Sequence, residues 1–432
     1  MLLTTLLLSV LTPADPPLPS LYALRVGRAE TIAHGTIEHA VVLVENGKIV
    51  TVGQDLEIER GIPVIELPDA TLLPGLVDCY SRIGLDSEGS SGFEPQARAS
   101  DELYADQKLW KEVLETGVTT LGMYPGGSGI PGQGFALQPH GATREQMILK
   151  DPTFLLVHMR SDPGAKKFLR DGLAKADEYD EKEKKNQEKW DKDQEKKGAK
   201  KEEKKEEAKS FTPQGFESSS FEPAAFEPAQ DKAKKERKGY VPSEPDAKSK
   251  PFVELRQGKL RPLFTLSKAA DYLHLLDVLA KEEFEFDARI QLRDDLDLHY
   301  VMDKFGEKKL RVAMEPRITL QPNTRRERNY AMELAKAGGK PVFVPRTDSV
   351  NGMKDWLRHV GEVVAAGLDR EVALRAVTLE PAVLLGLGER LGSLEAGKDA
   401  TFVLYDGDPF ELSTRVVAVV LGGELVHGEI KQ

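Results

Sequence analysis

The fold is decided by the stretch Leu72-Leu73-Pro74-Gly75-Leu76-Val77-Asp78, which separates two kinds of sequence. Before it, short β-rich pieces follow one another from Tyr22 to Leu73. Among them Asn46-Gly47 is a hairpin signal, because both residues tolerate the positive φ that such a turn needs. Towards the other end, the chain again reads as short strands with turns over 401–405, 416–421 and 424–427. We expect these two terminal β segments to form one sheet.

Between the terminal β segments, helical and strand-like segments alternate. Helical spacing over 101–115 precedes a strand-like run at 118–121. The same order recurs with 271–280 before 288–292, and with 325–337 before 342–344. Such alternation favours parallel strands joined by crossover helices. From this pattern alone the fold is of the α/β class, and a barrel is only one of its two common arrangements.

Composition and charge limit the function. A chain of 432 residues with 40% hydrophobic residues can bury a large core. Its net charge of -11 argues against non-specific binding to nucleic acid or anionic membranes, which needs a basic face. The single cysteine, Cys79, excludes an intramolecular disulfide and a cysteine zinc cluster. Small or peptide-like partners are therefore expected.

The first 14 residues resemble a short secretory signal. An apolar run, Met1 to Leu11, is followed by Thr12-Pro13-Ala14, although no Lys or Arg precedes it. The run is too short to span a bilayer as a helix, and no later stretch is apolar enough to do so. If the signal is real, the protein is exported to the periplasm or the extracellular space. The alternatives, a buried first strand or a mis-called start codon, imply a cytoplasmic protein.

A charged segment, about 166–250, interrupts the alternating pattern. Residues 171–210 are about two-thirds charged with both signs mixed, so they cannot form a core but can persist as a solvated helix. After them Phe216-Glu217, Phe221-Glu222-Pro223 and Phe226-Glu227-Pro228 repeat at five-residue spacing. The repeats are interpreted as a low-complexity linker, with a docking motif as the alternative. We treat 166–250 as an insertion in one loop of the main body.

The stretch Leu72 to Asp78 resembles the Pro-Gly-Leu-(Val/Ile)-Asp motif that closes the first barrel strand in the amidohydrolase superfamily. Other segments match, in the same order, motifs of its imidazolonepropionase-like and prolidase-like branch. They are Asn46–Ile49, Thr116–Thr120, Gly132–Gly134, Ala376–Ala382 and Leu391–Ala400. Each motif alone is weak, but their common order and spacing make the resemblance strong. It runs nearly end to end, apart from the insertion.

The resemblance implies a TIM-like (β/α)8 barrel over 74–387, flanked by a β-sandwich built from 15–73 and 388–432. It also implies hydrolysis of carbon–nitrogen bonds, either non-peptide or dipeptide-like. In this family one or two divalent ions, zinc or another metal, are bound by His, Asp and sometimes carboxylated Lys. Such ions activate water and polarise the scissile carbonyl. The ligands would lie at the carboxyl ends of the barrel strands.

The first ligand positions of the family are not retained. Where the family has His-x-His after the aspartate, this chain has Tyr80 and Arg82. A phenol is a poor ligand at neutral pH, and a guanidinium has no lone pair and repels a cation. Related enzymes carry a lysine in a later strand, and Gln138 aligns there. Its amide cannot be carboxylated.

The later positions are altered too. Thr265 and Ser267 align where the family reads His-Ala-His, and Gln291-Leu292-Arg293 aligns with Glu-His-Gly. Only Asp348, within Arg346-Thr347-Asp348-Ser349, keeps the family residue, which acts as ligand and proton acceptor. One carboxylate cannot hold an ion against water, so we expect neither a metal nor another cofactor.

Rebuilding the site from other residues is the alternative. Of the eight histidines, only His140 and His158 are expected near the barrel mouth, where they would have to converge with Asp348. Neither Cys79 nor Ser81 has a base nearby in the sequence, so we do not expect either to be a nucleophile.

The leading interpretation is a metal-free, catalytically impaired pseudoenzyme that binds a ligand or an active homologue. Its arginine-rich mouth would suit a carboxylate-bearing ligand. The expected partners are a small or peptide-like molecule, a second copy of the chain, or an active amidohydrolase. An active metal-dependent amidohydrolase with a non-standard site is the alternative, and a scaffold acting through the insertion is a third. The mouth would be lined by Tyr80, Arg82, Gln138, Thr265, Ser267, Arg293, Arg346 and Asp348.

Overall fold

The computed structural model describes residues 18–105, 108–209 and 240–430. The proposed signal over 1–14 and the Phe-Glu-Pro repeats over 216–229 lie outside the described residues. The chain divides into two compact units, one made of the residues up to 171 and from 254 onward, the other of 172–253. Within the described ranges no helix is long and apolar enough to cross a bilayer.

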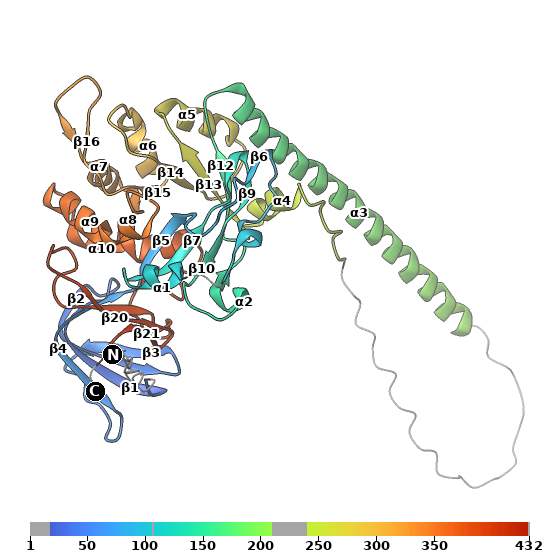
Figure 1. Cartoon of the computed structure of the whole chain (residues 1–432). Coiled ribbons are helices and arrows are strands. Elements are labelled where there is room, and N and C mark those ends of the chain that lie inside the picture. The colour runs from blue at the N-terminus through green and yellow to red at the C-terminus, as the bar shows by residue number, and fades with distance from the viewer. Residues whose placement is uncertain (1–17, 106–107, 210–239, 431–432) are drawn as a thin grey trace, which may run out of the picture. The chain divides into compact units, whose positions relative to one another are not determined.

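The two ends of the chain share one seven-stranded sheet, ordered β21-β20-β19-β4-β1-β2-β3 (Figure 1). Strands β2 and β3 form the hairpin expected at Asn46-Gly47, whose φ angles are 48° and 77°. Strand β4 pairs in parallel with β1 on one side and antiparallel with β19 on the other. Buried aliphatic and aromatic side chains from both chain ends fill one core against this sheet. The strands are β1 (Leu21–Glu30), β2 (Thr36–Glu45), β3 (Lys48–Gln54), β4 (Val64–Pro74), β19 (Phe402–Tyr405), β20 (Val416–Leu421) and β21 (Glu424–Gly428).

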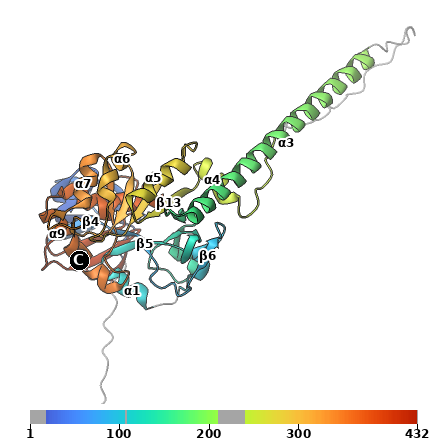
Figure 2. The same ribbon diagram turned by 90° about the horizontal axis from the view of Figure 1, so that it is seen from above.

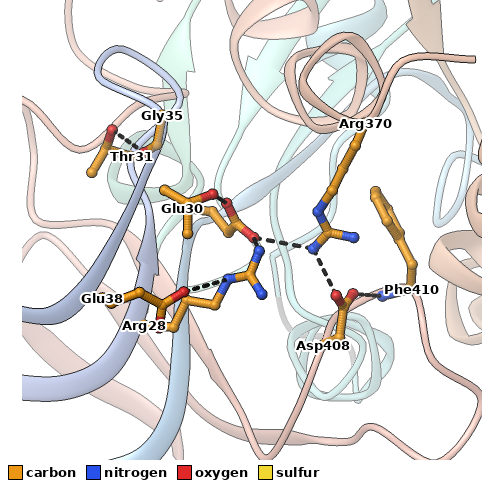
Figure 3. Close-up of polar contacts among 9 residues, drawn as sticks. Arg28, Glu30, Thr31, Gly35, Glu38, Arg370, Asp408 and Phe410 are labelled. Carbon is orange, nitrogen blue, oxygen red and sulfur yellow. Dashed lines mark hydrogen bonds and ion pairs between the residues drawn. The ribbon is translucent and has the colours of Figure 1, made fainter.

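An ion-pair network also ties the two chain ends together (Figure 3). Glu30, only 2% exposed, accepts from Arg28 at 2.8 Å and from Arg370 at 3.0 Å. Arg370 reaches Asp408 at 2.9 Å, and its guanidinium carbon lies 4.9 Å from the centre of the Phe410 ring. Because Glu30 is buried, these partners compensate for the removal of its carboxylate from water.

The main body carries parallel strands, as the alternating pattern predicted. One sheet has the order β11-β10-β7-β5, and another has the order β18-β15-β14-β13-β12-β9. Strands β5 and β7 pair in parallel, as do β12 to β15 and β18 in succession. The bounds are β5 (Leu76–Ser81), β7 (Val118–Met123), β9 (Gly132–Gln133), β10 (Phe135–Leu137), β11 (Ile148–Lys150), β12 (Phe154–His158), β13 (Arg261–Leu266), β14 (Asp287–Ile290), β15 (Arg311–Met314) and β18 (Lys340–Phe343).

The side chains of the two sheets meet in a common core. One cluster contains Val77 of β5, Ala136 of β10, Leu156 of β12, Ala313 of β15 and Val342 of β18. Among the described residues no strand pairing joins β18 to β5, so the described pairs form two open sheets rather than a closed ring. The mixed α/β class expected from the sequence is confirmed.

Helices connect successive strands. The expected helix at 271–280 is α5 (Ala269–Val278), and the one at 325–337 is shortened to α7 (Tyr330–Ala337). The segment 101–115 is only partly helical: the 3-10 helix η1 (Ala99–Glu102) precedes α1 (Leu109–Leu114), and Trp110 Nε1 donates to Tyr104 O at 3.3 Å. Two short strand pairs extend the loops. They are β6 (Ser90–Phe93) with β8 (Gly127–Ile130), and β16 (Thr319–Leu320) with β17 (Glu327–Arg328). The remaining helices are α2 (Arg144–Met147), α4 (Lys250–Arg256), η2 (Leu298–Val301), α6 (Met302–Glu307), α8 (Val350–Lys354), α9 (Trp356–Ala365), α10 (Arg370–Val377) and α11 (Leu379–Leu384).

The charged segment forms one long helix, α3 (Pro163–Lys209), visible along its length in Figure 2. Within the second unit, Glu183 on this helix accepts from Tyr240 Oη at 2.6 Å and from the backbone N of Ser243 at 3.0 Å. These hydrogen bonds lower the pKa of Glu183 to about 2. Tyr179 Oη adds a bond to Ser243 O at 2.7 Å. The Glu183 carboxylate therefore holds Tyr240 and Ser243 against the helix.

Candidate functional site

Five side chains gather at the carboxyl ends of the parallel strands. Strand β12 ends at His158, which is in register with Thr265 of β13, and Thr265 is in register with Arg289 of β14. Tyr80 lies on β5, and Tyr124 directly follows β7. Their rings stack 3.8 Å apart at an interplanar angle of 8°, and the Arg289 guanidinium carbon lies 5.2 Å from the Tyr80 ring centre. We call Tyr80, Tyr124, His158, Thr265 and Arg289 the mouth cluster.

Arg289 is the cation of this cluster. It forms an ion pair with Glu315, which follows β15, and the two side chains are 12% and 10% exposed. The second carboxylate oxygen of Glu315 accepts from the backbone N of Leu292 at 2.9 Å. Two further donors of Arg289, Nε and Nη1, are buried and have no hydrogen-bond partner among the described residues. Since unpaired buried donors are costly, these two groups mark a place for a polar ligand or water.

Two carboxylates lie beside the cluster. Asp348, exposed on the loop after β18, accepts from Ser81 Oγ at 2.6 Å and from the backbone N of Arg82 at 2.7 Å. Asp78 on β5 is 1% exposed, and its Oδ1 accepts from the backbone N of Tyr80 at 3.1 Å. Its Oδ2 has no hydrogen-bond partner within the described part of the chain. Burial, and then the negative charge of Asp348, raise the pKa of Asp78 to about 8.

The raised pKa of Asp78 predicts a pH-dependent stability. Between about pH 4 and pH 8 the folded protein keeps a proton that the unfolded chain has released, so the free energy of unfolding falls as the pH rises through this window. The variant Asp78→Asn should lack this fall. We expect it to gain at least ~1 kcal/mol over the wild type between pH 5 and pH 8. Urea unfolding at both pH values measures the difference, and the same gain in an exposed control, Asp86→Asn, would contradict the assignment.

The Arg82 side chain holds loops together rather than joining the mouth cluster. Its Nη1 donates to Tyr124 O at 3.0 Å, and its Nη2 donates to Ser87 O and pairs with Glu102 at 3.1 Å. Its guanidinium carbon lies 5.8 Å from the centre of the Tyr124 ring. Arg82 therefore links Tyr124 to the loop at Ser87 and to Glu102 through both of its terminal nitrogens.

The other predicted mouth residues are spread more widely. Gln138 follows β10, which runs antiparallel to β7 with Leu137 opposite Leu121, so Gln138 lies towards the amino-terminal end of β7. Its amide donates to His140 O at 3.3 Å and to Gln146 O at 3.2 Å. Ser267 is exposed beyond β13, at the start of α5. The structure brings neither residue to the mouth cluster.

Two predicted arginines follow strand ends but have local partners. Arg293 is exposed and pairs with Asp295 at 3.4 Å. Arg346 donates to Pro316 O at 2.8 Å and pairs with Glu362 at 2.7 Å. Of the predicted lining residues, Tyr80, Thr265 and Asp348 lie in or beside the mouth cluster.

Three comparisons place this geometry among known proteins. A family model described as "Amidohydrolase family" matches residues 351–427. The crystal structure of an amidohydrolase from Thermotoga maritima superimposes with a TM-score of 0.68 and 22% identity, covering 94% of this chain and all of that one. The N-acetylglucosamine-6-phosphate deacetylase of Bos taurus is 39% identical over 92 residues, and the amidohydrolase tasK of Hapsidospora irregularis is 44% identical over 86 residues. The family model, tasK and the Thermotoga maritima structure thus agree on a likeness to amidohydrolases.

The likeness to curated amidohydrolases is confined to part of each protein. The matched segments are 20% of this chain, 21% of the bovine deacetylase and 9% of tasK. The chain thus matches about a fifth or less of these relatives. The structural likeness is nearly complete in length, and at 22% identity it concerns the fold.

The described side chains offer few ligands for a divalent metal. Among the described residues, no group of three or more His, Cys, Asp or Glu side chains is placed to hold an ion. At the mouth, Arg289 is buried against Tyr80, and its positive charge would repel a cation there. Cys79 is buried, and burial raises the pKa of its thiol, so the thiolate that binds metals is disfavoured.

The sequence did not point to Arg289, Glu315 or Tyr124 as site residues. The signal for Arg289 was available, because it is a charged residue between the apolar residues Ala288 and Ile290 in a run that was predicted to be a strand. A charged side chain in such a run faces either a partner or a cavity. Of the two histidines considered, His158 lies in the mouth cluster, whereas His140 lies 3.9 Å from Glu424 of the terminal sheet.

Proposed function

We propose that this amidohydrolase-like chain binds a small, carboxylate-bearing acyl compound at the mouth cluster without a metal. In this proposal the two sheets complete a (β/α)8 barrel, and the seven-stranded sheet is the flanking sandwich of the family. The observation that carries the proposal is Arg289, whose buried Nε and Nη1 have no hydrogen-bond partner among the described residues. These two donors point to different sides of the guanidinium, so each can bond a separate oxygen of a polar ligand, and the positive charge favours a carboxylate.

The surroundings of Arg289 favour an anion over a cation. Tyr80 and Tyr124 provide a flat aromatic surface beside it. Asp78, whose pKa is about 8, is mostly protonated at neutral pH and can donate a hydrogen bond without adding negative charge. Glu315 balances Arg289 in the free protein, so an incoming carboxylate would compete with or add to that ion pair.

Titration calorimetry with N-acetylglycine tests the proposal, with N-acetylglycinamide as the matched probe that lacks the carboxylate. We expect the wild type to bind only the acid, and Arg289→Lys to bind it at least ~10-fold more weakly, because an ammonium cannot bond Glu315 and the ligand with the fixed, planar set of donors that a guanidinium has. Arg60→Met, an exposed arginine on a loop of the terminal sheet, should bind as the wild type does. Binding should survive treatment with a chelator. Equal binding of the amide, or loss of binding after chelation, would overturn the proposal.

The second candidate function is a metal-dependent hydrolase of carbon–nitrogen bonds. The likeness to amidohydrolases favours it, together with the proximity of Asp78 and Asp348. Elemental analysis of protein purified without chelator distinguishes the metal-dependent hydrolase from the metal-free binding protein. Stoichiometric zinc, manganese or iron, with turnover of N-acetylated substrates that chelation abolishes, would establish this candidate in place of the first.

A further inference from the structure

Two residues of the mouth cluster form a hydrogen-bonded pair of an imidazole and a hydroxyl. His158 Nδ1 and Thr265 Oγ1 lie 2.8 Å apart, on adjacent parallel strands at matched register. Both side chains are half-buried. A hydroxyl becomes a nucleophile when a base within hydrogen-bond reach can take its proton, and an imidazole is the usual base at neutral pH.

The protonation state of His158 suits this role. Burial, and then the positive charge of Arg160, lower the pKa of His158, so the imidazole is neutral near pH 7. With its proton on Nε2, the ring can accept the Thr265 hydroxyl hydrogen at Nδ1. Other hydroxyls of the mouth are arranged differently, since Ser81 Oγ donates to the Asp348 carboxylate, a weaker base than imidazole.

Arg289 lies on the other side of Thr265. The register of β13 and β14 places Thr265 beside Arg289, about one strand spacing of ~4.8 Å away. A ligand whose carboxylate binds Arg289 therefore brings the atoms next to that carboxylate towards Thr265 Oγ1.

We propose that Thr265 and His158 are a nucleophile and base that cleave the acyl–nitrogen or ester bond of a small ligand at this mouth, with no metal. The inference deepens the proposed binding function and rests on it for the choice of ligand. It gives Thr265 and His158 catalytic roles, in addition to their place in the lining of the site.

The reaction needs only the ligand and water. Thr265 Oγ1 bonds to the acyl carbon while its proton passes to His158 Nδ1. The carbon–nitrogen or carbon–oxygen bond breaks, and the leaving amine or alcohol takes the proton from His158. Water then attacks the acyl-threonine ester with His158 as base, which releases the acid and restores the threonine hydroxyl.

An activated ester that carries no carboxylate tests the pair apart from Arg289. The full-length protein is mixed with excess p-nitrophenyl acetate, and the release of p-nitrophenolate is followed together with the mass of the Thr265 peptide. We expect a burst of one equivalent and an acetyl group on Thr265. Thr265→Val should abolish both, whereas Thr265→Ser should keep them.

Two variants complete the design. His158→Asn keeps a hydrogen-bond acceptor near the Nδ1 position but is no base, and should slow the burst at least ~100-fold. Thr51→Val makes the same substitution in β3 of the terminal sheet and should leave the burst unchanged. Circular dichroism of each variant confirms that it is folded.

The outcomes separate this inference from the proposed binding function. Acetylation only at lysines, or an undiminished burst in Thr265→Val, overturns the catalytic pair, whatever calorimetry finds for N-acetylglycine. A burst at Thr265 in a protein that does not bind N-acetylglycine supports the pair and overturns the carboxylate site.

Discussion

Arg289→Met is expected to lower the free energy of unfolding by about 3 to 5 kcal/mol, because it leaves the buried Glu315 carboxylate without its cation. Methionine keeps the apolar stem of the arginine but not the guanidinium beside Tyr80, so part of the loss also comes from the space left there. The backbone N of Leu292 still donates to Glu315, but one hydrogen bond does not offset the burial of a full charge. Urea unfolding at pH 7 measures the change.

The double variant Arg289→Met with Glu315→Gln isolates the charge. Removing both charges should recover at least half of the loss, since no unpaired ion remains. Arg25→Met is the matched control, because its partner Glu66 is 58% exposed, and it should cost less than ~1 kcal/mol. If Arg289→Met and Arg25→Met cost the same, the Arg289–Glu315 pair is not the buried interaction described above.

Gly75→Ala is expected to destabilise the protein by about 3 kcal/mol, at the upper end of overpacking effects. A Cβ at this position would lie 2.0 Å from Thr119 Oγ1 and 2.7 Å from Thr119 Cβ, so rotating the threonine side chain cannot relieve the clash. Gly75 joins β4 of the terminal sheet to β5, and its N donates to Thr401 O at 3.2 Å. Any backbone shift that makes room therefore disturbs both sheets. Thermal and urea unfolding report the loss.

A compensating change in the neighbour tests this explanation. Thr119→Gly removes every side-chain atom near the new methyl group, so Gly75→Ala should cost much less in the Thr119→Gly background than alone. Gly164→Ala is the matched control, since its added methyl would meet only Asp162 Oδ1, the end of a flexible side chain, at 3.1 Å. An equal cost of Gly75→Ala in both backgrounds would show that the clash with Thr119 is not its cause.

The terminal sheet could be predicted because its signals are local. Alternating apolar residues and the Asn46-Gly47 turn depend on neighbours in the sequence, and both residues take the positive φ expected of them. The helix over 171–209 was predictable for the same reason, since mixed charges of both signs can support a solvated helix. The position of Gln138 could not be predicted in this way. It follows β10, which runs antiparallel to β7, whereas the strands of the barrel implied by the resemblance are parallel.

The site could be predicted only where a motif fixes a position. The motif predicts that Tyr80 lies near the end of the first strand of the main body, and Tyr80 is the second-to-last residue of β5. The pairing of Arg289 with Glu315, and of His158 with Thr265, depends on the register between strands far apart in the sequence. No local pattern encodes that register. The hydrogen bond from Arg82 to Tyr124 O likewise has no local signal in the sequence.

The position of β4 also bears on how the chain is made. In the sheet β4 lies between β1 and β19, so one of its edges is covered only by residues 402–405. A ribosome releases those residues long after β4, and until then β4 offers free backbone groups beside the apolar Leu72 and Leu73. Exposed edges of this kind invite pairing with other chains. This edge of β4 therefore stays open to association with other chains until the last part of the protein has been made.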